Sequence, residues 1–144
     1  MRIVQVGLVV VAVTLLGVGA AVGQVDLAKA LVGKWEGEQE MMSDRRSDPA
    51  RTLVITSVKQ VDGKWIADGR FGIGIPPGAT GPVKIEIDNS GKSPSLRWTG
   101  AAGAAYELSL LNEKNLVGKV TLTVQQLRSD TGSRDRTLKL EKKN

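Results

Sequence analysis

Two runs of alternating apolar residues, joined by a short polar connection, decide the fold class. Residues 106–122 read YELSLLNEKNLVGKVTL. In the first run, the side chains that share one face are Tyr106, Leu108 and Leu110. In the second run, they are Leu116, Val120 and Leu122. A period of two with one apolar face is typical of antiparallel strands that bury one side, and the polar residues between the runs indicate a turn.

The same pattern recurs along the chain and predicts an all-β fold. Strand character is found in the segments 33–42, 52–61, 64–73, 83–88, 95–99, 104–111, 116–127 and 136–142. Tight connections are expected at 62–63, 89–92 and 112–115, and wider ones at 43–51, 74–82 and 128–135. Alternate turns of a meander lie at the same end. We therefore expect an eight-stranded antiparallel up-and-down β-barrel with one open mouth.

Two details of this barrel follow from single residues. A short helix is expected before the first strand, because Asp26 can cap it and Gly33 can stop it. The sequence does not decide which side chains of segment 52–61 face the interior. Two sets of apolar residues are candidates: Leu53 with Ile55, and Val54 with Val58.

The first 23 residues resemble a secretory signal. Arg2 is followed by an apolar stretch and then by small residues, and Ala21 and Gly23 fit cleavage before Gln24. The sequence therefore predicts a signal peptide over residues 1–23, a barrel domain over residues 24–144, and a periplasmic or secreted protein. Contact with the membrane is expected only through this segment before cleavage. The alternative is an uncleaved anchor, for which spanning needs about 20 apolar residues.

The composition argues against most catalytic chemistry. The chain has no Cys and no His, which removes disulfides, thiol catalysis and the commonest general base and metal ligand. Glu36, Glu38 and Glu40 alternate with the inward Trp35 and are expected to face solvent. We therefore expect no enzyme, no cofactor and no metal site. The net charge of +5 is modest and mixed in sign, and with export it argues against nucleic-acid binding.

The segment Leu31-Val32-Gly33-Lys34-Trp35-Glu36-Gly37 resembles the G-x-W entry to the first strand of lipocalins and the wider calycin superfamily. A short helix before it and an eight-strand meander after it extend the resemblance over most of the chain, which is most similar to small lipocalin-like domains of bacterial secreted proteins. The family's T-D-Y motif is absent, and no Arg follows the last strand, where Lys142 or Lys143 can replace it. The resemblance implies a barrel that binds a small hydrophobic or amphipathic molecule.

Residue placement along the expected strands divides the barrel into a floor and a mouth. Trp35 and Trp65 open their strands at the tight-turn end and are expected to pack in the floor. Inner-face positions near the mouth are expected at Gln39, Met41, Phe71, Val83, Trp98, Tyr106, Val124 and Leu138. Among these, Gln39, Met41, Phe71, Trp98 and Tyr106 are the candidate ligand-binding residues. Aromatic walls with few polar groups suit an oriented ligand.

Arginines in two of the wide connections extend the candidate site to the rim. If the first and last strands pair, these connections become neighbours and bring together Arg45, Arg46, Arg51, Arg128, Arg134 and Arg136. Arg45 and Arg134 are the candidates for a carboxylate or phosphate group of a ligand. The alternative is that nearby Asp residues form solvated ion pairs with them. The corresponding alternative for the whole protein is an envelope structural or protein-interaction module with a filled core and no ligand.

Overall fold

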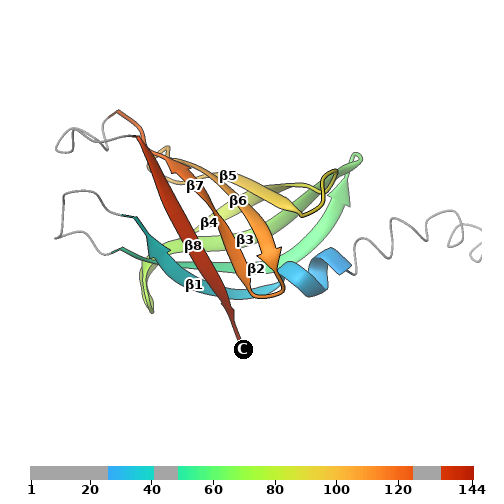
Figure 1. Ribbon diagram of the computed structural model, residues 1–144, viewed down its shortest axis with the longest axis horizontal. Helices are drawn as coiled ribbons and strands as arrows, with labels where there is room; N and C mark the ends of the chain where they lie inside the picture. Colours follow the sequence, from blue (N-terminus) through green and yellow to red (C-terminus); the bar gives the residue numbers. More distant parts are fainter. Residues whose placement is uncertain (1–25, 41–48, 125–133) are drawn as a thin grey trace, which may run out of the picture.

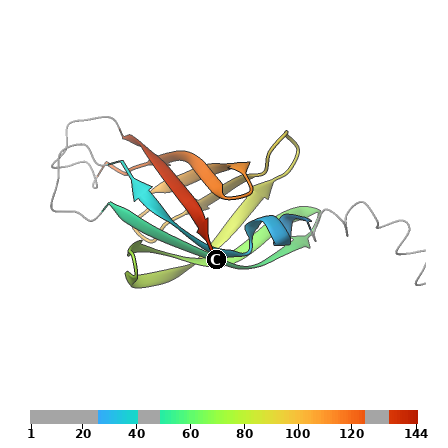
Figure 2. The ribbon, with the colours of Figure 1, turned by 60° about the horizontal axis from the view of Figure 1, so that its bottom comes forward.

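The computed structural model describes residues 26–40, 49–124 and 134–144, and they form a closed antiparallel barrel with one short helix (Figures 1 and 2). The strands follow one another around the barrel in chain order. Their bounds are β1 Gly33–Gln39, β2 Ala50–Val61, β3 Lys64–Gly74, β4 Pro77–Asp88, β5 Ser95–Thr99, β6 Ala105–Asn112, β7 Asn115–Thr121 and β8 Asp135–Lys143. The helix covers residues 26–31. The predicted fold class is confirmed, while the predicted signal peptide lies outside the described residues.

Pairing of the first and last strands closes the barrel. Strand β1 lies between β2 and β8, and its ladder with β8 runs from Lys34 opposite Lys143 to Gln39 opposite Leu138. The turn between β2 and β3 consists of Asp62 and Gly63, both with positive φ, as a two-residue hairpin requires. The five described connections between strands lie at two opposite ends of the barrel. The β2–β3, β4–β5 and β6–β7 turns lie at the helix end, and the β5–β6 turn and the β3–β4 hairpin lie at the other (Figure 1).

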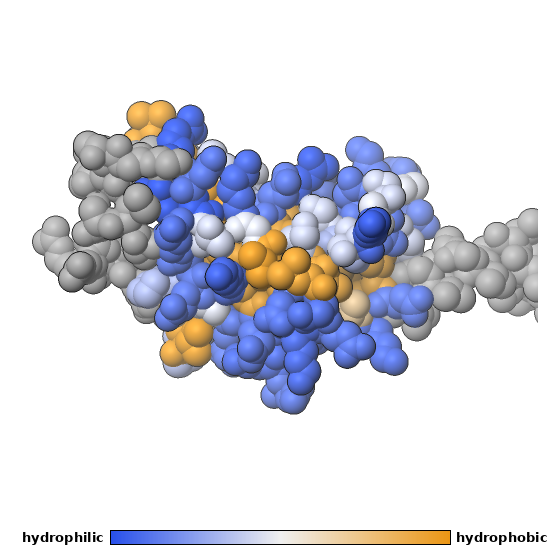
Figure 3. All heavy atoms as spheres, viewed as in Figure 1, coloured by the Kyte–Doolittle hydropathy of each residue, from blue (hydrophilic) through white to orange (hydrophobic). Residues whose placement is uncertain are grey.

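A packed apolar core fills the half of the barrel nearer the helix and continues to Leu53, Val120 and Leu138, which are the ladder partners of Phe71, Tyr106 and Gln39. The residues that are at most 1% exposed include Trp35, Leu53, Ile55, Ile85, Leu96, Leu108, Leu116, Val120, Leu138 and Leu140. None of these side chains borders a space that holds water, because such a space would expose part of it. The outer face is largely hydrophilic, with an apolar strip near its centre in the view of Figure 3.

A β-bulge resolves the open register of β2. Leu53 and Ile55 face the interior, the pairing with β3 shifts between Ile55 and Ser57, and Val58 is then buried as well. One extra residue moves the following side chains to the opposite face. Leu53 and Ile55 therefore form the inner face before the bulge, and Val58 joins the core after it, whereas Val54 is only partly buried and is not part of the core.

The β3–β4 connection differs most from the prediction. Residues 74–82 were expected as a wide loop, but Gly74 already pairs with Pro77, so the two strands form a long, tightly closed hairpin. Beyond Ile85, toward the hairpin end, β4 has no partner on its other side, because its ladder with β5 covers only residues 86–88. Proline and glycine are tolerated there because this part of β4 behaves as an edge strand.

Two strands are shorter than predicted at the end away from the helix. Strand β1 ends at Gln39 instead of at residue 42, and Met41 lies outside the described residues. Strand β7 ends at Thr121, opposite the first residue of β8, instead of at residue 127. Val124 therefore lies beyond the ladder and is 70% exposed, so its expected position on the inner face is wrong.

A clamp between the helix, β1 and β8 closes the floor. The indole Nε1 of Trp35 donates to the Leu31 carbonyl oxygen at 2.9 Å. The ammonium of Lys142 lies 5.6 Å from the centre of the Trp35 ring and donates to the carbonyls of Lys29 and Ala30 at 3.0 and 3.1 Å. Lys142 thus joins β8 to the helix beside the Trp35 ring, while Trp65, expected in the floor with Trp35, is only partly buried at the edge of the core.

Replacing Lys142 by Met tests this clamp. The apolar stem is retained, but two charge-assisted hydrogen bonds at the helix end and the cation–π contact are lost. We expect the free energy of unfolding to fall by about 1–2 kcal/mol in urea titrations followed by circular dichroism. Lys143→Met is the matched control, because the ion pair of Lys143 within the described residues is with the exposed Glu141, and the substitution should change stability by less than about 0.5 kcal/mol. Equal effects of the two substitutions would contradict the clamp.

Candidate ligand-binding site at the open end of the barrel

The end of the barrel opposite the helix contains a pocket of about 590 Å³. One wall is the β3–β4 hairpin, and the opposite wall is the turn between β5 and β6. The pocket is lined by Gln39, Arg51, Phe71, Ala104, Tyr106 and Leu122, together with residues 72–73, 78–81 and 100–102. A space of this size is within the range of small-molecule sites.

Three aromatic rings form the base of this open half. Trp98 and Tyr106 are opposite each other in the β5–β6 ladder, and their rings stack with centroids 4.9 Å apart and planes inclined by 4°. Phe71 on β3 contacts both rings edge-on, at 5.5 Å from Trp98 and 4.8 Å from Tyr106. Edge-to-face contacts of this kind add about 0.5–1.5 kcal/mol per pair beyond the buried area. The cluster is therefore a rigid apolar surface beneath the pocket.

Polar side chains face the interior on the neighbouring strands β2, β1 and β8. Gln39 and Arg51 are each 6% exposed and Arg136 is 3% exposed. The backbone explains their direction: Arg51 lies two residues before Leu53, and Arg136 lies two residues before Leu138, on the same inner faces. Each guanidinium donates to a nearby backbone carbonyl, at 2.8 Å for Arg51 and 3.1 Å for Arg136. Both side chains also make other interactions within the chain.

Gln39 Oε1 and the Trp98 indole Nε1 are among the buried polar atoms of this region that have no hydrogen-bond partner within the described residues. An unsatisfied buried donor or acceptor costs about 1–3 kcal/mol. A terminal amide can turn about its last bond, so Gln39 can present either its oxygen or its nitrogen to a neighbouring molecule.

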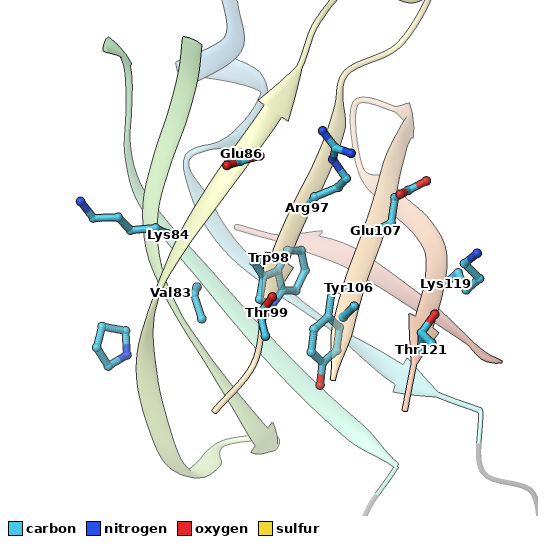
Figure 4. A pocket seen from close by; sticks show the side chains of 12 residues that line it. Val83, Lys84, Glu86, Arg97, Trp98, Thr99, Tyr106, Glu107, Lys119 and Thr121 are labelled. Atoms are coloured by element: carbon cyan, nitrogen blue, oxygen red, sulfur yellow. The ribbon is translucent and has the colours of Figure 1, made fainter. Parts of the chain in front are cut away.

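A second opening lies in the side of the barrel, where β4 diverges from β5. It holds a pocket of about 650 Å³ between Pro82, Val83 and Lys84 on one side and the β5–β6 hairpin on the other. Figure 4 shows the indole of Trp98 between the two strands, with the Tyr106 ring parallel to it and the Tyr106 hydroxyl directed toward the open end. The stacked pair therefore separates the side opening from the packed core.

The structure brings together four of the seven candidate residues: Gln39, Phe71, Trp98 and Tyr106. Met41 and Arg45 lie outside the described residues. Arg134 is exposed, and its Nε donates to the Leu122 carbonyl at 2.9 Å. The buried arginines of the pocket region are instead Arg51 and Arg136, which sequence reasoning assigned to the rim. Their spacing of two from Leu53 and Leu138 was the signal for an inward direction.

A scan against protein-family models finds no match, and a search of curated proteins finds no relative. The function is therefore inferred from the geometry of the barrel. Within the described residues, no group of three or more acidic side chains converges as a metal site would require.

Burial of Tyr106 gives a spectroscopic test of the pocket. Desolvation raises the pKa of its phenol above the ordinary value of 10.0, and the nearby positive charge of Arg51 acts in the opposite direction. Tyr106 is the one tyrosine of the chain, so alkaline absorbance titration reports this group alone. We expect a midpoint above that of free tyrosine, and a further rise in Arg51→Gln.

The same shift predicts how stability depends on pH. A folded-state pKa above the unfolded value favours the neutral phenol in the folded protein. The contribution of Tyr106 to the free energy of unfolding is therefore complete below pH 10, and it is lost as the pH rises from there through the raised pKa of the folded protein. Tyr106→Phe should lack this alkaline loss in urea titrations at several pH values. A Tyr106 midpoint at or below that of free tyrosine would contradict the buried position.

Proposed function

We propose that this protein is an exported lipocalin-like barrel that binds a small amphipathic anion noncovalently in its open half. The apolar part of the ligand would lie against Phe71 and Tyr106, and its charged head would lie near Arg51. The observation that carries the proposal is the Gln39 amide oxygen, which has no hydrogen-bond partner within the described residues. It lines the same pocket of about 590 Å³ as Arg51, and this pocket has an aromatic base. A buried polar atom is costly to the free protein and is compensated when a ligand bonds to it.

An anionic head is favoured by charge. Arg51 and Arg136 place two guanidinium groups on inner faces of the barrel, and guanidinium binds carboxylate or phosphate through paired hydrogen bonds. Because the half of the barrel nearer the helix is packed with side chains, we expect a short ligand that is held at the open end. An envelope module without a ligand is the second candidate, and the packed half of the barrel is the observation that favours it.

Replacing Gln39 by Leu separates a binding role from a structural one. If the amide binds a ligand, the free energy of unfolding of the ligand-free variant should be about 1 kcal/mol higher than that of the unmodified protein, because an unsatisfied buried atom is removed. It should also bind dodecanoate several-fold more weakly, measured by titration of tryptophan fluorescence. Gln60→Leu, at an exposed position of β2, is the control and should leave the affinity unchanged. Loss of stability with unchanged dodecanoate binding would contradict the proposal.

Replacing Arg51 by Gln tests the anionic head. We expect about a tenfold loss of dodecanoate affinity, equivalent to about 1.4 kcal/mol, and a smaller loss for uncharged dodecanol. Arg97→Gln is the matched control, because Arg97 lies on an outward-facing position of β5 and should leave both affinities unchanged. Equal losses for the two probes in Arg51→Gln would exclude a role for its charge. Absence of dodecanoate binding to the unmodified protein would exclude the site.

A further inference from the structure

The end of the β3–β4 hairpin is an uncharged, apolar projection. Residues 71–83 read FGIGIPPGATGPV and contain no acidic or basic side chain. Ile73 and Ile75 are 55% and 46% exposed, although each is large and aliphatic. The hairpin projects at the lower left of Figure 1, and the same place carries an exposed hydrophobic group in Figure 3. The exposed isoleucines therefore lie at a tip and not on the flank of the barrel.

Other exposed apolar residues surround the same end. Ala101 and Ala102 are exposed in the β5–β6 turn and line the mouth pocket opposite the hairpin. Val124 follows the end of β7 and is 70% exposed. These residues belong to separate connections around the pocket, so they form several projecting points and not one flat face.

Positive charge lies at the base of the tip. The Arg70 guanidinium donates to the hydroxyl and the carbonyl of Thr80, both at 2.9 Å, and is thereby held across the two strands of the hairpin. Lys84 is exposed on the other strand, just beyond the uncharged segment. The whole chain has a net charge of +5. Apolar tips with basic residues behind them are the arrangement by which proteins enter the boundary between lipid headgroups and acyl chains.

We propose that the β3–β4 tip docks on an anionic lipid surface, with Ile73 and Ile75 in the apolar boundary and Arg70 and Lys84 among the headgroups. A fluid bilayer accommodates separate projecting tips, whereas a protein partner needs a matching concave surface for each. This contact differs from the expectation in the sequence analysis, in which the protein contacts a membrane only through its predicted signal peptide. It places the mouth pocket against the lipid surface, and it stands whether or not the pocket holds a ligand.

Site-specific labelling tests the tip in the full chain. Because the chain has no cysteine, Ile75→Cys carries a single environment-sensitive nitrobenzoxadiazole label. Val61→Cys is the matched control, since Val61 is 44% exposed at the end of β2, next to the turn at the opposite end of the barrel. With phosphatidylcholine/phosphatidylglycerol vesicles we expect a blue shift and brighter emission at position 75 and no change at 61. No change at 75, or equal changes at both positions, would overturn the proposal.

A charge at the tip provides a second measurement. Ile75→Asp should bind the same vesicles at least about tenfold more weakly in co-sedimentation, and Val61→Asp should stay within about twofold of the unmodified protein. Vesicles of phosphatidylcholine alone should bind more weakly than mixed vesicles, and equal binding would refute the role of the basic residues. Dodecanoate titration of Ile75→Asp without vesicles should be unchanged, because Ile75 does not line the pocket. This arm distinguishes a failure of lipid docking from a failure of the ligand site.

Discussion

Closure of β1 on β8 is the constraint on which the structure depends. Eight strands can close only if each is strongly coiled, and neighbouring backbones then come very close at particular points. At Gly37 the carbonyl of Lys139 occupies the space that a Cβ would need, and at Gly118 the carbonyl of Glu107 does the same. Both glycines lie on inner faces: Gly37 lies between Trp35 and Gln39, and Gly118 lies between Leu116 and Val120. A small residue at these points permits the curvature, and the large neighbours on either side fill the interior.

Closure also makes the two ends of the barrel chemically different. At the helix end, Trp35, Leu31 and Lys142 join three separate segments of the chain, and the adjoining core is dry. At the other end the inner faces change from aliphatic to aromatic and polar, and no helix among the described residues covers the strands. Stability is therefore concentrated in one half. The other half can carry polar groups such as Gln39 at a cost that the packed half offsets.

Much of the fold and part of the candidate site could be predicted from the sequence, and the features that could not be predicted have physical causes. Alternation predicted all eight strands, the closed order and the aromatic pair, because one-sided burial leaves a period of two. The bulge at Thr56 was not predictable from alternation, since it depends on how β2 meets β3. The buried Arg51 and Arg136 were assigned to the rim because charged residues near loops are usually solvated. Their inward direction is set by register alone.

The short ladder between β4 and β5 connects the remaining features. Only three residue pairs join these strands, from Glu86 opposite Arg97 to Asp88 opposite Ser95. Beyond them β4 follows β3 alone, which permits Pro82 within a strand and opens the side pocket beside Trp98. The freed half of β4 then extends with β3 past the barrel wall as the apolar tip. A longer β4–β5 ladder would seal the side opening and draw the hairpin into the wall, so both features have a common origin in this incomplete pairing.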